Sequence, residues 1–414
     1  MKASESNPNY PSKVREMTNY TIREIKKVCK DIGPRPSGEE NERKAQDYVA
    51  DSMSKVADSV VKEKFELHPK AFMGWVPLDV ILMTISVILT LLSYFDVLPS
   101  ASTAFSVVSV VLTSLAIIFT FFEFLLYKKF LDPFFPKRET YNVVCTRKAA
   151  GETKRRIVFS GHIDSAYEWY FTHLGGGKLL TTMIALAFGA IAITLAASIV
   201  SFFDVPNGVR VTAIVVLFVC LIPILMCSMF VNWKLCVPGA NDNLTGVFAS
   251  MSVLRYMAAN DIRFENTEVV CVSMACEEAG LRGAKEYVKK HCGEDDVETV
   301  FVGTDTLRDF DDMGVYNKDM TGTVKLDKQA AAMVKHASDI AGYNLPYSSV
   351  FFGSSDAAAI QQGGMKAVAL AAMDPTPARY YHTRGDTADN LDPKPSRPAS
   401  TFFLKPRSSM TARA

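Results

Sequence analysis

Hydrophobic residues are distributed very unevenly along this chain. Four long apolar runs stand out, at residues 74–95, 99–122, 179–203 and 211–232. Each is close to the roughly 20 residues that a membrane-spanning helix requires. The last three contain no Asp, Glu, Lys or Arg, and a buried globular helix of that length seldom avoids all four residue types. These runs are therefore predicted to be membrane helices.

The first apolar run is the least regular of the four. Pro77 and Asp79 lie in its opening turn and shorten its uninterrupted apolar part, so an interfacial or buried helix is an alternative for this run. Short links at 94–103 and 204–210 join the runs into two pairs. Each pair predicts a hairpin that returns to the side of the bilayer it left, so all polar segments can fold together on one side.

Basic residues flank the two pairs almost entirely on the side of the polar segments. The links offer only Arg210, whereas the other flanks hold Lys62, Lys64, Lys70, Lys128, Lys129, Lys137, Arg138, Lys178 and Lys234. Positively charged flanks favour the cytoplasmic side of a membrane. The sequence therefore predicts a multi-pass integral membrane protein whose polar part is cytoplasmic.

The polar segments alternate between two kinds of hydrophobic pattern. Short apolar runs, typical of buried strands, occupy residues 157–160, 267–274, 299–302 and 367–371. Helical periodicity occupies residues 41–53, 246–259, 283–291 and 327–341. This alternation is an α/β pattern.

Composition changes this picture little. Lys plus Arg (45) nearly cancel Asp plus Glu (44), which gives no electrostatic reason to expect a nucleic acid partner. Residues 1–27 are polar and lack the apolar core of a signal peptide, so a cytosolic start is expected. The eight cysteines lack CxxC spacing and are interpreted as reduced thiols.

Five short segments end a predicted strand or open a loop with possible metal ligands: 160–164, 238–246, 276–283, 302–305 and 380–387. On an extended chain, residues two apart face the same way, so Asp164 can orient His162. Asp242 could bridge two cations. Adjacent carboxylates at Glu277 and Glu278 point in different directions, so one can bind metal while the other moves protons. Two His and three carboxylates suit two zinc ions about 3.5 to 4 Å apart.

In their order, these segments resemble the zinc aminopeptidase family that includes secreted bacterial leucyl aminopeptidases, glutamate carboxypeptidases, glutaminyl cyclases and the transferrin receptor. The resemblance also covers residues 32–38, which precede Ala45, Tyr48 and Val49, and residues 353–356 before the last predicted strand. It extends from about residue 20 to 392, with the apolar hairpins as insertions. It implies a three-layer α/β/α fold with a central mixed, mostly parallel sheet, interrupted by two transmembrane α-helical hairpins.

Carried over residue by residue, the resemblance assigns roles to ten side chains. His162 and Asp305 would hold one zinc ion, Glu278 and His382 the other, and Asp242 would bridge the two. Glu277 would be the general base. The remaining assignments are Asp164 and Asp386 as residues that hold the ligands in place, and Tyr380 or Tyr381 as a group near the oxyanion or substrate. Aromatic residues beside an active site are more often packing residues.

The resulting hypothesis is a membrane-anchored, zinc-dependent aminopeptidase that acts on peptides with a free N-terminus. The catalytic domain would comprise residues 1–72, 128–178 and 233–392, and the hairpins residues 73–127 and 179–232. Residues 393–414 form an irregular tail where the family has an amphipathic closing helix. Open alternatives are a glutaminyl-cyclase-like transferase with a single zinc and a non-catalytic membrane receptor or scaffold; a transporter is less favoured.

Overall fold

The computed structural model describes residues 10–350, 352–372 and 380–391. The chain divides into two compact units. The sheet unit comprises Met1–Pro69, Lys137–Tyr167 and Lys234–Ala414, and the helical unit comprises Lys70–Pro136 and Glu168–Trp233. The tail at 393–414 lies outside the described residues.

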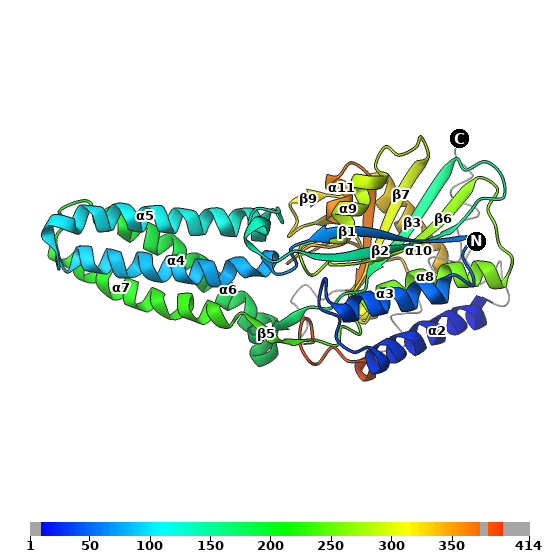
Figure 1. The fold of residues 1–414 in the computed structure, drawn as a ribbon, viewed down its shortest axis with the longest axis horizontal. Helices are drawn as coiled ribbons and strands as arrows, with labels where there is room; N and C mark the ends of the chain where they lie inside the picture. The colour runs from blue at the N-terminus through cyan, green and yellow to red at the C-terminus, as the bar shows by residue number, and fades with distance from the viewer. Residues whose placement is uncertain (1–9, 351, 373–379, 392–414) are drawn as a thin grey trace. The chain divides into compact units, whose positions relative to one another are not determined.

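A large mixed sheet forms the centre of the sheet unit, with the strand order β1-β2-β6-β3-β7-β11-β8-β10 (Figure 1). Its middle strands, which are the four predicted from sequence, run parallel: β6 (Thr267–Met274), β3 (Arg155–His162), β7 (Glu298–Asp305) and β11 (Lys366–Ala372). Antiparallel pairs β1–β2, β2–β6 and β11–β8 extend it on both sides. The outer strands are β1 (Ser59–Leu67), β2 (Arg138–Arg147), β8 (Met313–Asp319), β10 (Tyr347–Ser349) and β9 (Val324–Lys325), which pairs with β8.

Helices cover both faces of this sheet (Figure 1). On one face, α3 (Glu40–Met53), α8 (Leu244–Ala259) and α10 (Lys328–Ala341) share the largest apolar core with the strands, and α2 (Tyr10–Asp31) packs on α8. On the other face lie α9 (Arg282–His291) and α11 (Asp356–Gln362), which contact each other. Strand side chains alternate between the two layers. The α/β fold expected from the resemblance is confirmed.

Helix α2 is absent from the elements predicted by the sequence. Its buried positions, Val14, Met17, Thr21, Ile25 and Val28, follow helical spacing. Lys and Arg residues lie between these positions along the helix, and the buried face also includes Thr18 and Glu24, so the apolar stripe is narrow and easily overlooked. Strand β1 is also absent from the sequence prediction, because charged residues occupy its exposed face.

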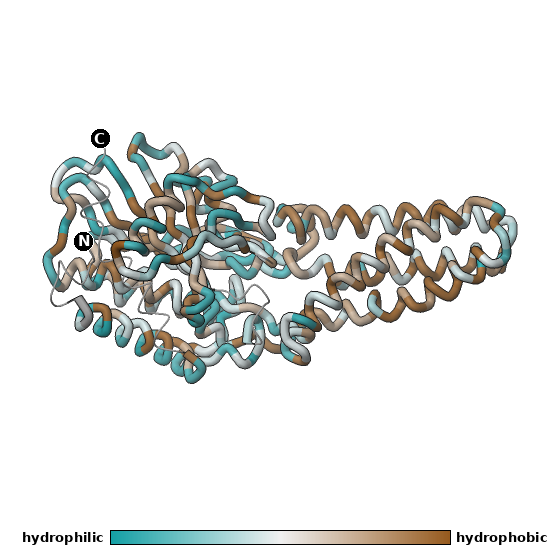
Figure 2. The backbone as a smooth tube through the Cα atoms, turned by 180° about the vertical axis from the view of Figure 1, so that it is seen from behind, coloured by the Kyte–Doolittle hydropathy of each residue, from teal (hydrophilic) through white to brown (hydrophobic). Residues whose placement is uncertain are grey.

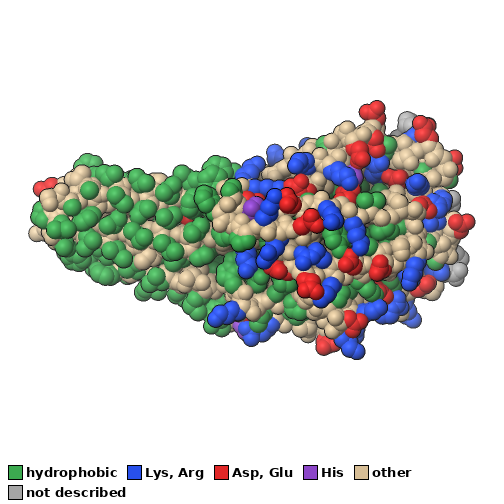
Figure 3. Space-filling model, viewed as in Figure 1, with side chains coloured by type: hydrophobic (Ala, Val, Ile, Leu, Met, Phe, Trp, Pro, Cys, Tyr) green, Lys and Arg blue, Asp and Glu red, His purple; other side chains and the backbone are tan. Residues whose placement is uncertain are grey.

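The helical unit contains four helices that are long and apolar enough to cross a membrane, by length and composition. Figure 2 shows that hydrophobic residues predominate along these helices, and Figure 3 shows hydrophobic side chains covering the visible face of this unit. The helices are α4 (Ala71–Tyr94), α5 (Ser102–Phe119), α6 (Tyr170–Val200) and α7 (Asn207–Met226). A π-helical turn at Thr120–Leu125 continues α5, and Gly176, with φ 66° and ψ −164°, kinks α6.

Hydroxyl groups link α4, α5 and α6 inside the helical unit. Ser109 bonds to Ser86, Thr90 and Ser198 over 2.6 to 2.7 Å. Thr90 also bonds to Ser198 over 2.8 Å. Where lipid would remove the hydrophobic advantage of helix packing, such interhelical bonds hold helices together.

The last apolar run is shorter as a helix than its sequence suggests. Helix α7 and its 3-10 turn end at Met229, and the chain then forms strand β5 (Val231–Cys236), which pairs with β4 (Tyr167–Trp169). Residues 231 and 232 of the predicted helical run are therefore strand. The short 3-10 helices in the described part of the chain are Pro99–Ala101, Asp132–Phe134, Cys227–Met229, Phe310–Asp312 and Ala388–Asn390.

Candidate metal centre

The five predicted ligands come together at one end of the parallel strands. His162 is the last residue of β3 and Asp305 the last residue of β7, while Glu278 follows β6. Asp242 lies two residues before α8, and His382 follows β11. Because ligands of open α/β sheets bind beyond the carboxyl ends of the strands, this is the expected place for a site.

Asp242 occupies the middle of this group. Its Oδ1 lies 3.2 Å from Nε2 of His162, and its Oδ2 lies 3.2 Å from Nε2 of His382. Oε1 of Glu278 lies 3.2 Å from the same nitrogen of His382. Oδ1 of Asp305 lies 4.0 Å from Nε2 of His162. The five side chains thus form one connected cluster in which each oxygen of Asp242 faces a different imidazole.

Glu277 belongs to the same cluster. Its Oε2 lies 3.8 Å from Nε2 of His162. Single ligand atoms of His162, Glu277 and Asp305 all lie within 4.8 Å of one another, as do those of His162, Asp242 and Glu278. His162 takes part in both groups, so proximity alone does not divide the ligands between two ions.

The residues fit divalent cations on two grounds. Oδ2 of Asp242 and Oε1 of Glu278 are buried and accept no hydrogen bond within the described part of the chain. Imidazole nitrogens and carboxylate oxygens are also the donors that zinc prefers. Buried acceptors without donors are costly unless a cation or a proton satisfies them. The donor set therefore suits a bound metal.

The electrostatics of the cluster show the same need for positive charge. Burial raises the pKa of Glu277 well above its ordinary value and that of Asp305 to about 7. Burial also opposes ionisation of Asp242, but the two imidazoles 3.2 Å from its oxygens hold its pKa below the ordinary range. Burial lowers the pKa of His382, yet Glu278 and Asp242 raise it to about 10. Several carboxylates in one buried space thus compete for few positive charges.

Asp164 holds the loop that carries the two glutamates. Its Oδ1 accepts a hydrogen bond from the backbone N–H of Glu277 at 3.1 Å, and its Oδ2 accepts one from that of Glu278 at 3.0 Å. Oδ2 also accepts a hydrogen bond from the hydroxyl of Ser37, with 2.6 Å between the two oxygens. Oδ1 lies 3.4 Å from Nδ1 of His162. One carboxylate therefore orients an imidazole and positions two neighbouring acidic residues.

Asp386 acts on the segment that carries Asp242. It accepts hydrogen bonds from the backbone N–H groups of Asn241 at 2.8 Å and Asp242 at 3.0 Å. Asn243 then caps helix α8 by accepting from the N–H of Gly246 at 2.9 Å, and its side-chain amide donates to the carbonyl of Thr304 at 2.8 Å. The loop before α8 is therefore fixed from both sides, next to the end of β7.

Arg35 is a positioning residue whose role is not predicted from the sequence. Its side chain is fully buried and donates to four backbone carbonyls, those of Ile163, Gly33, Pro238 and Gly239, over 2.6 to 2.9 Å. Gly239 has a φ of 60°, and a Cβ there would lie 2.9 Å from Arg35 Nη2. The guanidinium thus joins the loop after His162 to the loop before Asp242.

We expect Arg35→Lys to destabilise the protein by about 2–3 kcal/mol, because an ammonium cannot reach four separate carbonyls and leaves some unsatisfied. Chemical denaturation of the purified protein in detergent measures this loss. Arg23→Lys is the matched control, since the Arg23 side chain is 63% exposed. Equal stability of the two variants would show that the Arg35 bonds do not hold the loops together.

Glu42 supports the opposite side of the glutamate loop. Its Oε1 accepts a hydrogen bond from the backbone N–H of Cys276 at 2.8 Å. Its Oε2 accepts hydrogen bonds from the backbone N–H of Gly38 at 2.9 Å and from the hydroxyl of Thr140 at 2.7 Å. Burial raises the pKa of Glu42 to about 7.

Two residues at the site have left-handed backbone: Cys276 has a φ of 57° and His382 has a φ of 50°. Left-handed backbone at non-glycine residues is strained and concentrates at functional sites.

The two adjacent tyrosines lie in different surroundings. The ring of Tyr381 stacks on that of His382 at 4.0 Å between centroids, and Tyr381 lines the cavity at the cluster. The hydroxyl of Tyr380 instead donates to Asp309, and its ring lies 4.3 Å from the Arg308 guanidinium. Of the two tyrosines, Tyr381 is the one whose ring contacts a predicted ligand.

A small cavity of about 20 Å³ opens beside the cluster. Its polar side holds His162, Asp242, Glu277, Asp305 and His382, and its other lining residues include Tyr316, Val350, Phe352, Ala369 and Ala371. Asp356, the first residue of α11, is buried nearby, and burial raises its pKa to about 8. The sequence motif at 353–356 marked this region but gave Asp356 no role.

Part of the chain is similar in sequence to a known protein family. Residues 227–404 match the model of peptidase family M28. Residues 227–404 therefore resemble this peptidase family. This match covers the segments of Asp242, Glu277, Glu278, Asp305 and His382, and it confirms the resemblance at the level of the family. No similar sequence was found among curated proteins.

Solved structures with the same fold include two aminopeptidases and a glutaminyl cyclase. The zinc aminopeptidase BSAP of Bacillus subtilis matches with a TM-score of 0.54 and 13% identity over 93% of each chain. The LapA aminopeptidase of Legionella pneumophila matches with a TM-score of 0.53 and 11% identity, over 98% of this chain and 71% of that one. The glutaminyl cyclase of Porphyromonas gingivalis matches with a TM-score of 0.55 and 10% identity, over 94% and 95%. At such identities the likeness shows the fold.

Proposed function

We propose that this chain is a dinuclear zinc aminopeptidase anchored in a membrane. The observation that carries the proposal is the position of Asp242, whose two oxygens each lie 3.2 Å from a different imidazole. A carboxylate that faces two ligand sets is the arrangement that a bridged metal pair requires. In this proposal His162 and Asp305 hold one zinc ion, and Glu278 and His382 hold the other.

Glu277 is the general base in this proposal. Zinc at such a site supplies a bound water whose pKa falls to about 7. Glu277 is buried beside the ligands, and its backbone N–H is fixed by Asp164. Its carboxylate accepts a proton from the water that attacks the scissile carbonyl and then donates that proton to the leaving amine. Because burial favours the protonated form of Glu277, the carboxyl can hold the proton between these steps.

Tyr381 is the better of the two tyrosines for a role near the substrate. It lines the cavity and stacks on His382, whereas the Tyr380 hydroxyl is engaged with Asp309. The apolar wall that includes Tyr316 and Val350 faces the same cavity. We infer that this wall accepts an uncharged side chain at the peptide's N-terminus.

A peptide-library digest tests this function directly. We expect the purified full-length protein to release N-terminal residues from short peptides, and to stop when a chelator removes zinc. Peptides with an acetylated N-terminus are the matched control and should remain intact. Conversion of N-terminal glutamine to a cyclic product, without release of residues, would instead favour the glutaminyl cyclase alternative. Turnover that survives complete metal removal would reject a metal-dependent mechanism.

We also propose that α4 to α7 cross the bilayer as two hairpins, with the sheet unit in the cytoplasm. All four helices are long and apolar enough to cross a membrane, by length and composition. The topology can be read from cysteine labelling in intact cells. A membrane-impermeant maleimide should label Ser100→Cys in the first link, but not native Cys292, which is exposed in the sheet unit. Labelling of both positions from outside would contradict this topology.

A further inference from the structure

The chain turns back on the end of α5 before it leaves the helical unit. The segment that does so, residues 126–135, is called the return segment here. The backbone N–H of Lys128 donates to the carbonyl of Phe122 in the π-helical turn at 2.8 Å. The N–H of Leu131 donates to Oε1 of Glu123, a buried residue of the same turn, at 2.6 Å. These bonds keep the return segment beside the turn that it follows.

Two aromatic side chains attach the return segment to α4. The ring of Tyr127 lies 4.6 Å from that of Phe72, measured between centroids. Phe135 contacts the helix at Gly74, where a Cβ would lie 2.4 Å from two atoms of the phenylalanine ring. Because both ends of the segment are packed against α4, its exposed side chains have a fixed place on the surface of the helical unit.

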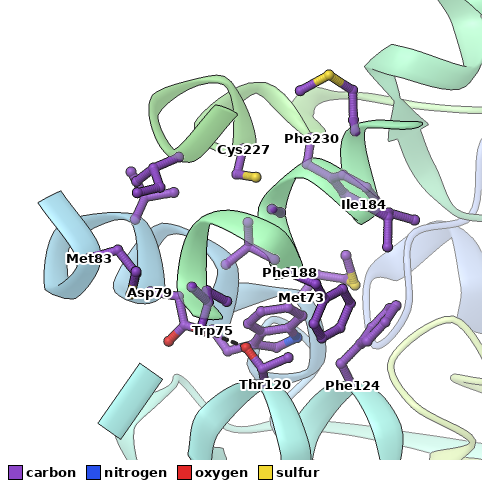
Figure 4. A pocket seen from close by; sticks show the side chains of 16 residues that line it. Met73, Trp75, Asp79, Met83, Thr120, Phe124, Ile184, Phe188, Cys227 and Phe230 are labelled. Carbon is purple, nitrogen blue, oxygen red and sulfur yellow. Dashed lines mark hydrogen bonds between the residues drawn. The ribbon is translucent and has the colours of Figure 1, made fainter. Parts of the chain in front are cut away.

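The π-helical turn has an inner and an outer side. On the inner side, the hydroxyl of Thr120 donates to Asp79 of α4 at 2.7 Å, and Phe124 lines the same apolar interior (Figure 4). On the outer side, the ring of Phe130 stacks on that of Phe122 with 5.1 Å between centroids, and Phe130 is 44% exposed. The return segment therefore packs on the side of the turn that faces away from the interior.

Phe134 is the most exposed large apolar side chain that the structure describes. It is 79% exposed, although its neighbour Phe135 is packed against α4. Phe130 and Phe134 thus present two phenylalanine rings at the end of an apolar helix, next to Lys128 and Lys129, which are also exposed. Exposed apolar side chains rimmed by charged ones mark surfaces that bind a protein or a membrane.

The two ends of the helical unit expose different charges. Near the starts of α4 and α6 and the end of α5, the exposed charged side chains are Lys70, Lys128, Lys129 and Lys178. The acidic residues of this end are buried, and they are Glu123, Asp132 and Glu168. The exposed acidic residues of the unit lie in the two links at the other end, at Asp96 and Asp204. One end of this fully described unit therefore exposes basic side chains and no acidic ones.

We propose that the return segment binds the head groups of anionic phospholipids through Lys128 and Lys129, while Phe130 and Phe134 insert among the lipid tails. Lipid is favoured as the partner because the exposed rings continue the apolar surface of a helix long enough to cross a membrane. An anionic head group is favoured because the exposed charges at this end are all basic, and basic residues beside a membrane helix attract such lipids. This binding rests on the proposed insertion of the four helices. It is independent of the metal centre, because its residues all belong to the helical unit.

Native mass spectrometry of the full-length protein, titrated in neutral detergent with single phospholipids, tests the charge preference. We expect phosphatidylglycerol to bind at least about tenfold more tightly than phosphatidylcholine. Lys128→Gln and Lys129→Gln should each weaken phosphatidylglycerol binding by about fivefold, the effect of one basic side chain near an anionic lipid. Lys289→Gln is the matched control, since that side chain is 78% exposed in the sheet unit, and it should bind like the unaltered protein.

The outcomes of this titration separate the possible ligands. Equal binding of the two lipids, or full phosphatidylglycerol affinity in the double variant of Lys128 and Lys129, would overturn the proposal. Displacement of the lipid by inorganic phosphate would show a site for the free anion instead, and would overturn the choice of a lipid. Equal thermal unfolding temperatures of the variants and the unaltered protein show that a loss of binding is not a loss of folding.

Phe134→Trp tests the insertion of the ring. In nanodiscs whose lipids carry bromine on their acyl chains, the added tryptophan emission should be quenched relative to nanodiscs without bromine. Tyr347→Trp is the control, because Tyr347 is 49% exposed but belongs to the sheet unit, and its added emission should remain. Absence of quenching at position 134 in a protein that enters nanodiscs would overturn the insertion of Phe134. A protein that does not enter nanodiscs at all would contradict membrane insertion itself.

Discussion

Replacing Glu277 with Gln is expected to lower kcat by about 10² to 10⁴-fold, the range that a general acid–base group contributes, while the zinc content stays the same. Gln keeps the size and the hydrogen-bonding shape of Glu277 but cannot accept a proton from water. In the proposed ligand pairing Glu277 holds no metal, although its Oε2 lies 3.8 Å from Nε2 of His162. KM should therefore change little.

Steady-state kinetics with a chromogenic amino-acid substrate, together with elemental analysis of the same sample, measures both effects. Glu294→Gln is the matched control, because that side chain is 50% exposed and lies outside the cluster. A Glu277→Gln protein with ordinary kcat would place the base elsewhere. Loss of zinc together with activity would assign Glu277 to the metal ligands instead.

Asp242→Asn should have the largest effect on metal binding. Each oxygen of Asp242 faces one imidazole, and an amide presents only one oxygen and carries no charge. We expect the zinc content to fall from two ions per chain to at most one. Activity should fall by at least about 10⁴-fold, beyond the loss of a single acid–base group, because both ligand sets lose a shared anion.

Asp386→Asn is the informative comparison for Asp242→Asn. Asp386 holds the backbone N–H groups of Asn241 and Asp242, and loss of such support weakens metal affinity by about 10 to 100-fold. Two zinc ions should still bind when the metal is in excess. If Asp242→Asn also retained two ions under those conditions, Asp242 would not be the bridge.

The core of the fold was accessible from the sequence because its signals are local. The four parallel strands are largely buried and appear in the sequence as short apolar runs such as 267–274. Three of the four long apolar runs lack charged residues over about 20 positions. Edge elements gave weaker signals. Strand β1 carries charged residues on its exposed face, and α2 packs through a narrow stripe on α8. Such elements are recognisable only with knowledge of what covers them.

In the site, too, some residues can be predicted from their local sequence and others cannot. Candidate ligands could be named from residue type and position after strands, and the structure places His162, Asp242, Glu278, Asp305 and His382 in one cluster. Residues that hold the ligand loops could not be found in this way. Glu42 and Cys276 lie 234 residues apart in the chain, and Arg35 joins loops more than 70 residues from each other. Their roles come from tertiary contacts.

Neighbouring residues can also be indistinguishable in sequence. Tyr380 and Tyr381 are identical in type and adjacent, yet one bonds to Asp309 and the other stacks on His382. Their directions depend on the turn at residues 380–383, where the N–H of Thr383 donates to the carbonyl of Tyr380 at 3.0 Å. Only the backbone path decides which ring enters the cavity.

Anomalous X-ray diffraction at the zinc absorption edge, from crystals of the full-length protein grown with zinc, tests the central claim most directly. The proposed centre predicts two peaks about 3.5 to 4 Å apart, one between His162 and Asp305 and one between Glu278 and His382, with Asp242 between them. A single peak, or peaks away from Asp242, would contradict a dinuclear centre on these residues.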